Sequence, residues 1–186
     1  MKKCFLFILL FIPFISVSAS KEKVTLSKCV DGDTARFIIK GEDVKVRFLG
    51  INSPEIETNN KKGEEYGEEA KNYTCKKLKN ANKMQIEYDS NSDKEDKYGR
   101  TLAYVFVDDK LLESMILKRG YATVKYVKEN YKYYDELIEA EKYAKNKKLG
   151  LYSNKKQDDD FEKDLASIIK KYAKKLFGNI FEEIFN

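Results

Sequence analysis

The sequence contains no histidine and no tryptophan, and only two prolines and three cysteines among its 186 residues. Without histidine, Ser-His and Cys-His nucleophilic sites, histidine general bases and histidine zinc sites are excluded. Any acid–base chemistry must therefore use carboxylates, lysine, tyrosine or a metal-bound water. The few cysteines, with no histidine beside them, also argue against a zinc site.

The N-terminus has the pattern of a secretory signal peptide. Two lysines precede a short apolar run and then small residues placed for cleavage before Ser20. The apolar run is short for a membrane span, and Pro13 interrupts it. We therefore divide the chain into a signal peptide (1–19), a central domain (20–153) and a C-terminal region (154–186). We expect a secreted protein and leave association with the cell surface open.

Export changes the interpretation of the cysteines. Cys4 would leave with the signal peptide, so Cys29 and Cys75 would remain in the mature protein. An even number of cysteines in an oxidising compartment favours one disulfide. Two buried thiols are nearly as good an interpretation, and both stay open.

Apolar periodicity predicts an α+β domain. Alternation predicts five strands, at 23–31, 33–40, 44–51, 83–89 and 101–109. Helical spacing predicts three helices, at 64–80, 111–120 and 131–148. Five strands with a helix between the third and the fourth favour a small Greek-key β-barrel of the OB type.

The C-terminal region has a different pattern. A polar linker at 156–160 precedes a stretch whose apolar residues share one helical stripe, namely Phe161, Leu165, Ile168, Ile169, Tyr172, Leu176, Ile180 and Ile184. We expect an extra amphipathic helix that contacts the barrel, a second copy or a membrane surface.

The charge balance gives a weak indication of the ligand. The formal net charge is +5, or +3 once Lys2 and Lys3 leave with the signal peptide. The C-terminal region from Asn154 has equal numbers of lysines and acids, so the excess lies in the central domain. A basic domain suits an anionic ligand such as nucleic acid, although many inert proteins are as basic.

Two sequence blocks, "VDGDTARF" and "VRFLGINSPE", supply oxygen donors. Asp31 and Asp33 are carboxylates on either side of a glycine, Asn52 offers an amide oxygen, and Glu55 is a further carboxylate. Hard oxygen donors of this kind suit calcium better than a transition metal. Asp31-Gly32-Asp33 alone is more typical of a hairpin turn.

Arginine adds the complementary charge. Arg47 lies in the second block and Arg100 ends a third, "DKYGR". Their planar, permanently charged guanidinium groups match phosphate. A hard cation, carboxylates and two arginines are what phosphodiester hydrolysis requires. A calcium loop of the EF type at 89–100 is rejected because Lys94 replaces the glycine and Arg100 the terminal glutamate.

In this order, with strands between them, the three blocks resemble the staphylococcal nuclease (thermonuclease) family. The resemblance runs from about Val24 to Ser153 and includes "YGEEA", "LAYVFVDDKLLESMILKRGYATV" and "AKNKKLGLYS". It implies an OB-fold barrel with three helices. It also implies a calcium-dependent nuclease that cuts DNA and RNA with little sequence specificity and leaves 3′-phosphate ends.

The resemblance assigns roles to individual residues. Arg47 would grip the scissile phosphate, Glu55 would act as general base, and Arg100 would contact the leaving oxygen. One calcium ion would be held by Asp33, Asn52 and the backbone carbonyl of Ser53, with Asp31 as a supporting acid. The nucleotide pocket would be lined by Lys97, Tyr98 and Tyr126. The expected partners are single-stranded or locally melted DNA and RNA, with no obligatory protein partner.

Two positions depart from the family pattern. Asn52 stands where the family has a second calcium aspartate, so we expect weaker calcium binding. Lys128 stands where a second tyrosine is expected after Tyr126. The alternative function is a catalytically weak nucleic-acid-binding OB-fold module. Retention of all four principal residues favours the enzyme, namely Asp33, Arg47, Glu55 and Arg100.

Overall fold

The structure is a computed structural model that describes residues 21–59, 62–153 and 169. The predicted signal peptide lies outside the described residues, and so does the predicted C-terminal helix apart from Ile169. Among the described residues, no helix is both long and apolar enough to span a bilayer.

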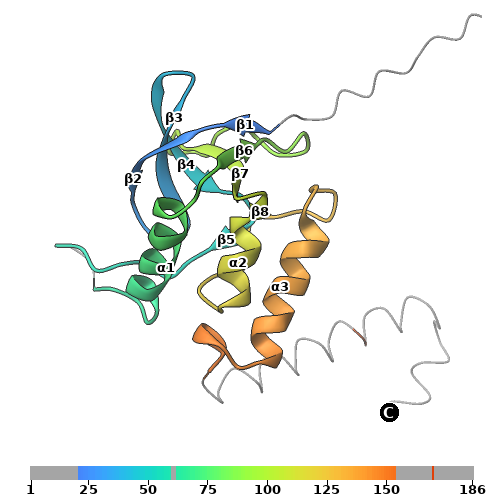
Figure 1. The fold of residues 1–186 in the computed structure, drawn as a ribbon. Helices are drawn as coiled ribbons and strands as arrows, with labels where there is room; N and C mark the ends of the chain where they lie inside the picture. Colours follow the sequence, from blue (N-terminus) through green and yellow to red (C-terminus); the bar gives the residue numbers. More distant parts are fainter. Residues whose placement is uncertain (1–20, 60–61, 154–168, 170–186) are drawn as a thin grey trace, which may run out of the picture.

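A mixed β-sheet forms the centre of the domain (Figure 1). Its strand order is β1-β6-β7-β4-β3-β2, with β8 paired to β7, and a separate ladder joins β5 to β9. Only β4 and β7 pair in parallel among these ladders. The strands are β1 (Glu22–Lys23), β2 (Thr25–Cys29), β3 (Thr34–Ile39), β4 (Glu42–Phe48), β5 (Ile51–Asn52), β6 (Met84–Glu87), β7 (Thr101–Val107), β8 (Lys110–Leu111) and β9 (Thr123–Val124).

The expectation of a closed five-stranded barrel is corrected by these ladders. Within the described residues, the hydrogen-bonded path runs from β1 to β2 and no ladder joins its two ends. The first predicted strand is interrupted at Val24, so β1 pairs with β6 while β2 pairs with β3. The strand predicted at 44–51 ends at Phe48, because the chain turns at Gly50 (φ +82°) before β5 pairs with β9.

The β3–β4 hairpin brings the end of β4 close to the turn that precedes β3. Phe37 and Val46 are completely buried, as the alternation of the two strands requires. Arg47 lies opposite Thr34 in this ladder, and the Phe48 amide donates to the Asp33 carbonyl over 2.8 Å. The end of β4 is thereby held beside the turn that precedes β3.

Within residues 21–153, three α-helices accompany the sheet, and each is shorter than predicted. They are α1 (Gly67–Lys79), α2 (Leu112–Lys118) and α3 (Tyr134–Asn146), followed by a short 3-10 turn, η1 (Gly150–Tyr152). Helix α1 contacts β2, and α2 packs between β7 and α3 (Figure 1). The buried positions of α1 recur every four residues and include Ala70, Thr74 and Leu78, which is the spacing of a helix with one covered face.

Candidate active site

One cleft of about 710 Å³ collects nearly all the residues singled out in the sequence. It receives side chains from the β2–β3 turn, β4, β5, the loop before β7 and the segment after β9. Nine predicted site residues line it: Asp31, Asp33, Arg47, Asn52, Glu55, Lys97, Tyr98, Arg100 and Tyr126. Ser53 is not part of the lining, but it is buried directly behind it.

Asp33 and Arg47 form the buried centre of the site. They are only 6% and 7% exposed, and Arg47 Nη2 lies 3.1 Å from Asp33 Oδ2. Arg47 Nη1 also donates to the Phe48 carbonyl over 2.8 Å, and the Thr34 hydroxyl donates to Asp33 Oδ1 over 3.0 Å. Arg47 is therefore not a solvated surface residue, since its guanidinium is held on two sides.

Asn52 and Ser53 complete this hydrogen-bonded group. The Ser53 amide donates to Asp33 Oδ2 over 2.7 Å, and Arg47 Nη2 donates to Asn52 Oδ1 over 3.2 Å. The Asn52 amide nitrogen donates to the Ser53 carbonyl over 3.4 Å. The Asp33 carboxylate and the Asn52 amide oxygen thus lie within hydrogen-bonding distance of the same guanidinium nitrogen.

Asp31 supports the turn and adds negative charge. Its Oδ1 accepts a hydrogen bond from the Asp33 amide over 3.0 Å. Burial, and then the nearby charge of Asp33, raise the pKa of Asp31 to about 6. Two carboxylates are therefore crowded at the end of the cleft, where a bound cation would stabilise their ionised forms.

The side chains and carbonyls here that could bind a metal ion all offer oxygen atoms. The described part of the chain has no group of three His, Cys, Asp or Glu side chains placed to hold a metal ion. The carboxylates here are only two, and the remaining oxygens are an amide and a backbone carbonyl. Oxygens of these kinds are suitable ligands for calcium, whose affinity rises with the number of charged ligands.

Glu55 combines a fixed backbone with an exposed side chain. Its amide donates to Glu64 Oε2 over 3.0 Å, and its carbonyl accepts from the Glu64 amide over 2.9 Å. A Cβ at Gly67 would lie only 2.4 Å from the Glu55 carbonyl oxygen, so the start of α1 approaches this backbone closely. The Glu55 side chain lines the cleft and stays accessible to water.

Arg100 is oriented by Asp96, which the sequence interpretation did not select. Arg100 Nε and Nη2 lie 2.7 and 2.6 Å from Asp96 Oδ2, and the Tyr98 and Arg100 amides donate to Asp96 Oδ1. Partial burial would raise the pKa of Asp96, but the hydrogen bonds from Arg100 outweigh it and the pKa is lowered. The four-residue spacing within "DKYGR" was the available signal for this pair.

A further group of residues that line the cleft is exposed and aromatic. Tyr98 and Tyr126 are 70% and 74% exposed, and the Lys97 ammonium lies 5.0 Å from the centre of the Tyr98 ring. Lining residues that the sequence interpretation missed are Lys45, Asp93, Glu95 and Tyr131. Lys128 is not part of the lining, so the nearest further aromatic wall after Tyr126 comes from Tyr131.

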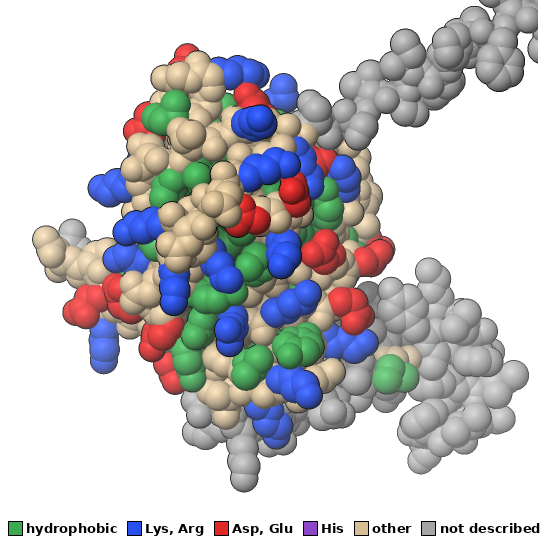
Figure 2. All heavy atoms as spheres, in the orientation of Figure 1, with side chains coloured by type: hydrophobic (Ala, Val, Ile, Leu, Met, Phe, Trp, Pro, Cys, Tyr) green, Lys and Arg blue, Asp and Glu red, His purple; other side chains and the backbone are tan. Residues whose placement is uncertain are grey.

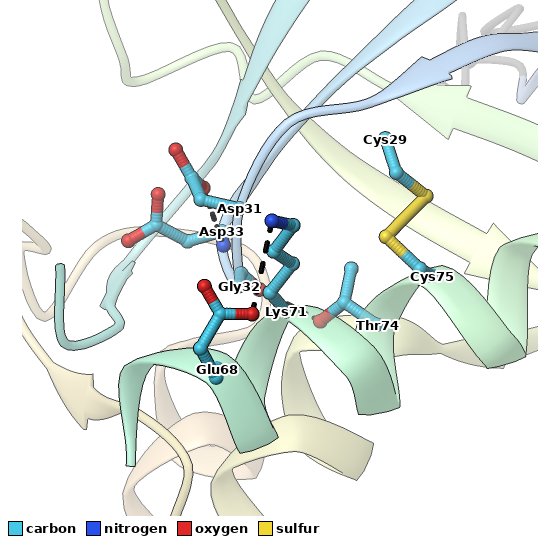
Figure 3. The surroundings of a disulfide bond; sticks show 8 residues. All are labelled: Cys29, Asp31, Gly32, Asp33, Glu68, Lys71, Thr74 and Cys75. Carbon is cyan, nitrogen blue, oxygen red and sulfur yellow. Dashed lines mark hydrogen bonds and ion pairs between the residues drawn. A yellow bond between two sulfur atoms is a disulfide. The ribbon is translucent and has the colours of Figure 1, made fainter. Parts of the chain in front are cut away.

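A disulfide lies beside the site. Cys29, at the end of β2, is bonded to Cys75 of α1, with the two Cα atoms 5.6 Å apart (Figure 3). The structure thus has a bonded pair at the two positions for which the sequence left a disulfide and free thiols as alternatives. Neither cysteine lines the cleft.

Basic side chains are spread over the surface. The face seen in Figure 2 carries many lysine and arginine side chains, with acidic and apolar side chains between them. An interspersed positive surface attracts polyanions without selecting a sequence.

The fold and the cleft together define a class: an OB-fold domain whose pocket has carboxylates and two arginines along its walls. The chain belongs to the staphylococcal nuclease family, since the model of the family described as staphylococcal nuclease homologue matches residues 45–154.

Several named proteins are similar to the chain. Endonuclease YncB of Bacillus subtilis strain 168 is 44% identical over 131 residues, which cover 70% of this chain and 61% of that protein. The SPbeta prophage-derived endonuclease YokF of the same organism is also 44% identical over 131 residues, but only 44% of its length is covered. The thermonuclease of Staphylococcus hyicus is 33% identical over 137 residues, covering 74% of this chain and 79% of that protein. The chain therefore spans less than two thirds of the two Bacillus relatives.

Proposed function

We propose that the protein is a secreted, calcium-dependent nuclease that hydrolyses the phosphodiester bonds of DNA and RNA with little sequence specificity and leaves 3′-phosphate ends. The observation that carries this proposal is the convergence of Arg47, Glu55 and Arg100 on one cleft that also contains Asp31 and Asp33. The relatives named endonuclease and thermonuclease support the same reaction class.

Arg47 is the group best placed to hold the scissile phosphate. Its Nη1 and Nη2 are fixed by the Phe48 carbonyl, Asp33 and Asn52, so the guanidinium is oriented before substrate arrives. An arginine has five N–H donors, and those not used by these contacts are available to phosphate oxygens. Such pre-oriented donors stabilise the charge that develops in the transition state.

Glu55 and Arg100 account for the two ends of the reaction. The Glu55 carboxylate would accept a proton from the attacking water, whose oxygen forms the new bond to phosphorus. The bond between phosphorus and the 5′ oxygen would break, which leaves the phosphate on the 3′ side. Arg100, held by Asp96, would donate a hydrogen bond to the departing oxygen while solvent protonates it.

Calcium, when bound, would neutralise phosphate charge and polarise the phosphoryl group. The residues that would hold it are Asp33, Asn52 through its side-chain oxygen, and Ser53 through its carbonyl, with Asp31 nearby. The all-oxygen donor set supports calcium, and the amide at Asn52 supports weaker binding than a third carboxylate would give.

Export is a proposal that rests on the sequence of residues 1–19.

Single-stranded or locally melted nucleic acid is the proposed partner, because a base can enter the cleft only when it is unstacked.

The test is incubation of the mature protein with single-stranded DNA and with RNA, in millimolar calcium or in excess chelator, followed by identification of the product ends. We expect cleavage with calcium only, and 3′-phosphate ends. Binding without cleavage by folded protein would contradict the enzyme and favour the alternative, a nucleic-acid-binding module.

A further inference from the structure

We propose that helix α1 positions the Asp31–Asp33 turn of the active site through two groups outside the cleft: the Thr74 hydroxyl and the Cys29–Cys75 disulfide. We call these two groups the α1 brace. The link between the brace and catalysis rests on the proposed nuclease function, whereas the link between the brace and the geometry of the turn does not.

Thr74 makes a direct contact with the turn. Its side chain is completely buried, and its hydroxyl donates a hydrogen bond of 2.8 Å to the carbonyl of Gly32 (Figure 3). Gly32 is the residue between Asp31 and Asp33, so this bond acts on the peptide that connects the two carboxylates. Loss of the hydroxyl would leave a buried carbonyl without this donor, which is costly.

Gly32 is also in close contact with its surroundings. A Cβ on this residue would lie 2.7 Å from Ser53 Cβ and Oγ and 2.8 Å from Ala70 Cβ. The turn is therefore enclosed between α1 on one side and the Ser53 segment on the other. A shift of α1 would move the turn relative to Ser53, whose amide donates to Asp33.

The disulfide acts next to the same contact. Cys75 follows Thr74 in α1, and Cys29 lies two residues before Asp31. The covalent bond therefore holds the strand that enters the turn, and the hydrogen bond holds the central residue of the turn (Figure 3). The disulfide closes a loop with a sequence separation of 46, which contains every predicted site residue from Asp31 to Glu55. Arg100 and Tyr126 lie outside this loop.

These contacts give the brace a specific role. The disulfide limits how far α1 can separate from the end of β2, and the Thr74 hydroxyl sets how the Gly32 peptide is turned. Both hold the Asp33 carboxylate and the Ser53 backbone in one arrangement before any ligand binds. Thr74 is thus a positioning residue, and the brace should affect calcium affinity and kcat more than substrate KM.

The experiment compares Thr74→Val, Thr74→Ser and the double variant Cys29→Ser/Cys75→Ser with wild type. Val107→Ala is the matched control, because it truncates a buried side chain at the end of β7 that pairs with β8. The first readout is amide hydrogen exchange of Asp33 and Ser53 in metal-free protein, relative to amides in β7. The second is calcium affinity by calorimetry, and the third is kcat and KM on single-stranded DNA.

We expect Thr74→Val to speed exchange at Asp33 and Ser53 by about tenfold relative to β7, because one buried hydrogen bond contributes on the order of a factor of ten. Calcium affinity and kcat should fall by about the same factor, and Thr74→Ser should restore both. The double cysteine variant should show the same local loss, and Val107→Ala should not.

Equal exchange changes at the turn and in β7 would overturn the brace, and so would failure of Thr74→Ser to restore the wild-type values. If exchange and calcium affinity change as expected while wild-type protein cuts no nucleic acid, the brace stands and the proposed function fails.

Discussion

Two groups of residues in the cleft differ sharply in burial, and we call them the buried end and the exposed end. Asp33 and Arg47 are more than nine-tenths buried, whereas Tyr98 and Tyr126 expose most of their surface. At the buried end, Asp33 accepts hydrogen bonds from the Thr34 hydroxyl and the Ser53 amide, and Arg47 donates to the Phe48 carbonyl. At the exposed end, Lys97 and Arg100 lie over the Tyr98 ring and Lys125 lies over the Tyr126 ring, while both rings remain largely open to water.

This difference matches the two parts of the proposed substrate. A phosphate group is the same in every nucleotide, so a rigid, pre-oriented site suits it. Bases differ in shape and hydrogen bonding, and an exposed aromatic ring stacks on any of them. The contrast would explain how the proposed nuclease acts on the phosphodiester group with little sequence preference.

The largest expected effect is at the arginines. Arg47→Ala and Arg100→Ala should each lower kcat by roughly two to three orders of magnitude, because each removes a charged donor aimed at the transition state. Arg36→Ala is the control, since Arg36 forms a surface ion pair with Asp43 at 2.9 Å and should change activity by less than about twofold. Steady-state assays measure these changes, and near-full activity of both cleft variants would refute the assignment of the site.

Reduction of the disulfide, which lies beside the buried end, should have the next largest effect, a loss of stability of the domain. A dithiol reductant would convert the Cys29–Cys75 bond into two thiols and become oxidised to its own disulfide. With a sequence separation of 46, loop-closure entropy predicts a loss of about 4 kcal/mol in unfolding free energy. Urea titrations of oxidised and reduced protein measure this loss, and alkylation with mass measurement reports the starting state. Two freely alkylated thiols in exported, folded protein would contradict the bonded pair.

Asn52→Asp tests the charge of the buried end. Replacing the amide by a carboxylate adds a negative charge beside the calcium oxygens, so calcium binding should tighten by roughly tenfold. Calorimetric titration in the presence of a nucleotide inhibitor measures this change. Unchanged affinity would mean that Asn52 orients Arg47, through the 3.2 Å hydrogen bond, without contacting the metal.

The exposed end should respond more weakly. Tyr126→Ala and Tyr98→Ala should each raise KM by about fivefold with little change in kcat, which corresponds to about 1 kcal/mol of lost stacking. Tyr143→Ala is a suitable control, because Tyr143 is an exposed tyrosine of α3 that does not line the cleft. Identical KM values for the cleft variants and the control would remove the stacking role.

The smallest effect is expected from truncation. Protein that ends near Lys156 should keep the kcat of the full chain, because the C-terminal apolar stripe contains no residue of the three matched sequence blocks. Nuclease assays on both forms test this. A large loss of activity in a folded truncated form would show that the C-terminal region contributes to the site.

The sequence predicted the residues of the site better than their arrangement. In the sequence, Val44, Val46 and Phe48 alternate with Lys45 and Arg47, which is the pattern of a strand with Arg47 on the other face, and the register of β3 and β4 agrees. Local alternation could not reveal the turn at Gly50, because it depends on the pairing of β5 with the distant β9. Lys45 and Tyr131 were missed because membership of a cleft is decided by tertiary packing.

Buried polar groups were the other difficulty. Glu113 lies in a segment predicted to be helical, but nothing local signals that its side chain is completely buried. Its Oε1 accepts from the Val105 amide over 2.9 Å, while Oε2 has no hydrogen-bond partner among the described residues. Burial raises the pKa of this carboxyl well above its ordinary value. The burial results from the packing of α2 against β7, which the local sequence does not reveal.

The most direct test is to measure kcat and KM separately on four homopolymeric single-stranded DNAs in saturating calcium. It asks whether the buried end acts on the phosphate and the exposed end on the bases. We expect Arg47→Ala to lower kcat to the same degree on all four, and Tyr126→Ala to raise KM by a factor that depends on the base. If Tyr126→Ala instead lowers kcat as much as Arg47→Ala does, the assignment of phosphate chemistry to the buried end and base binding to the exposed end is wrong.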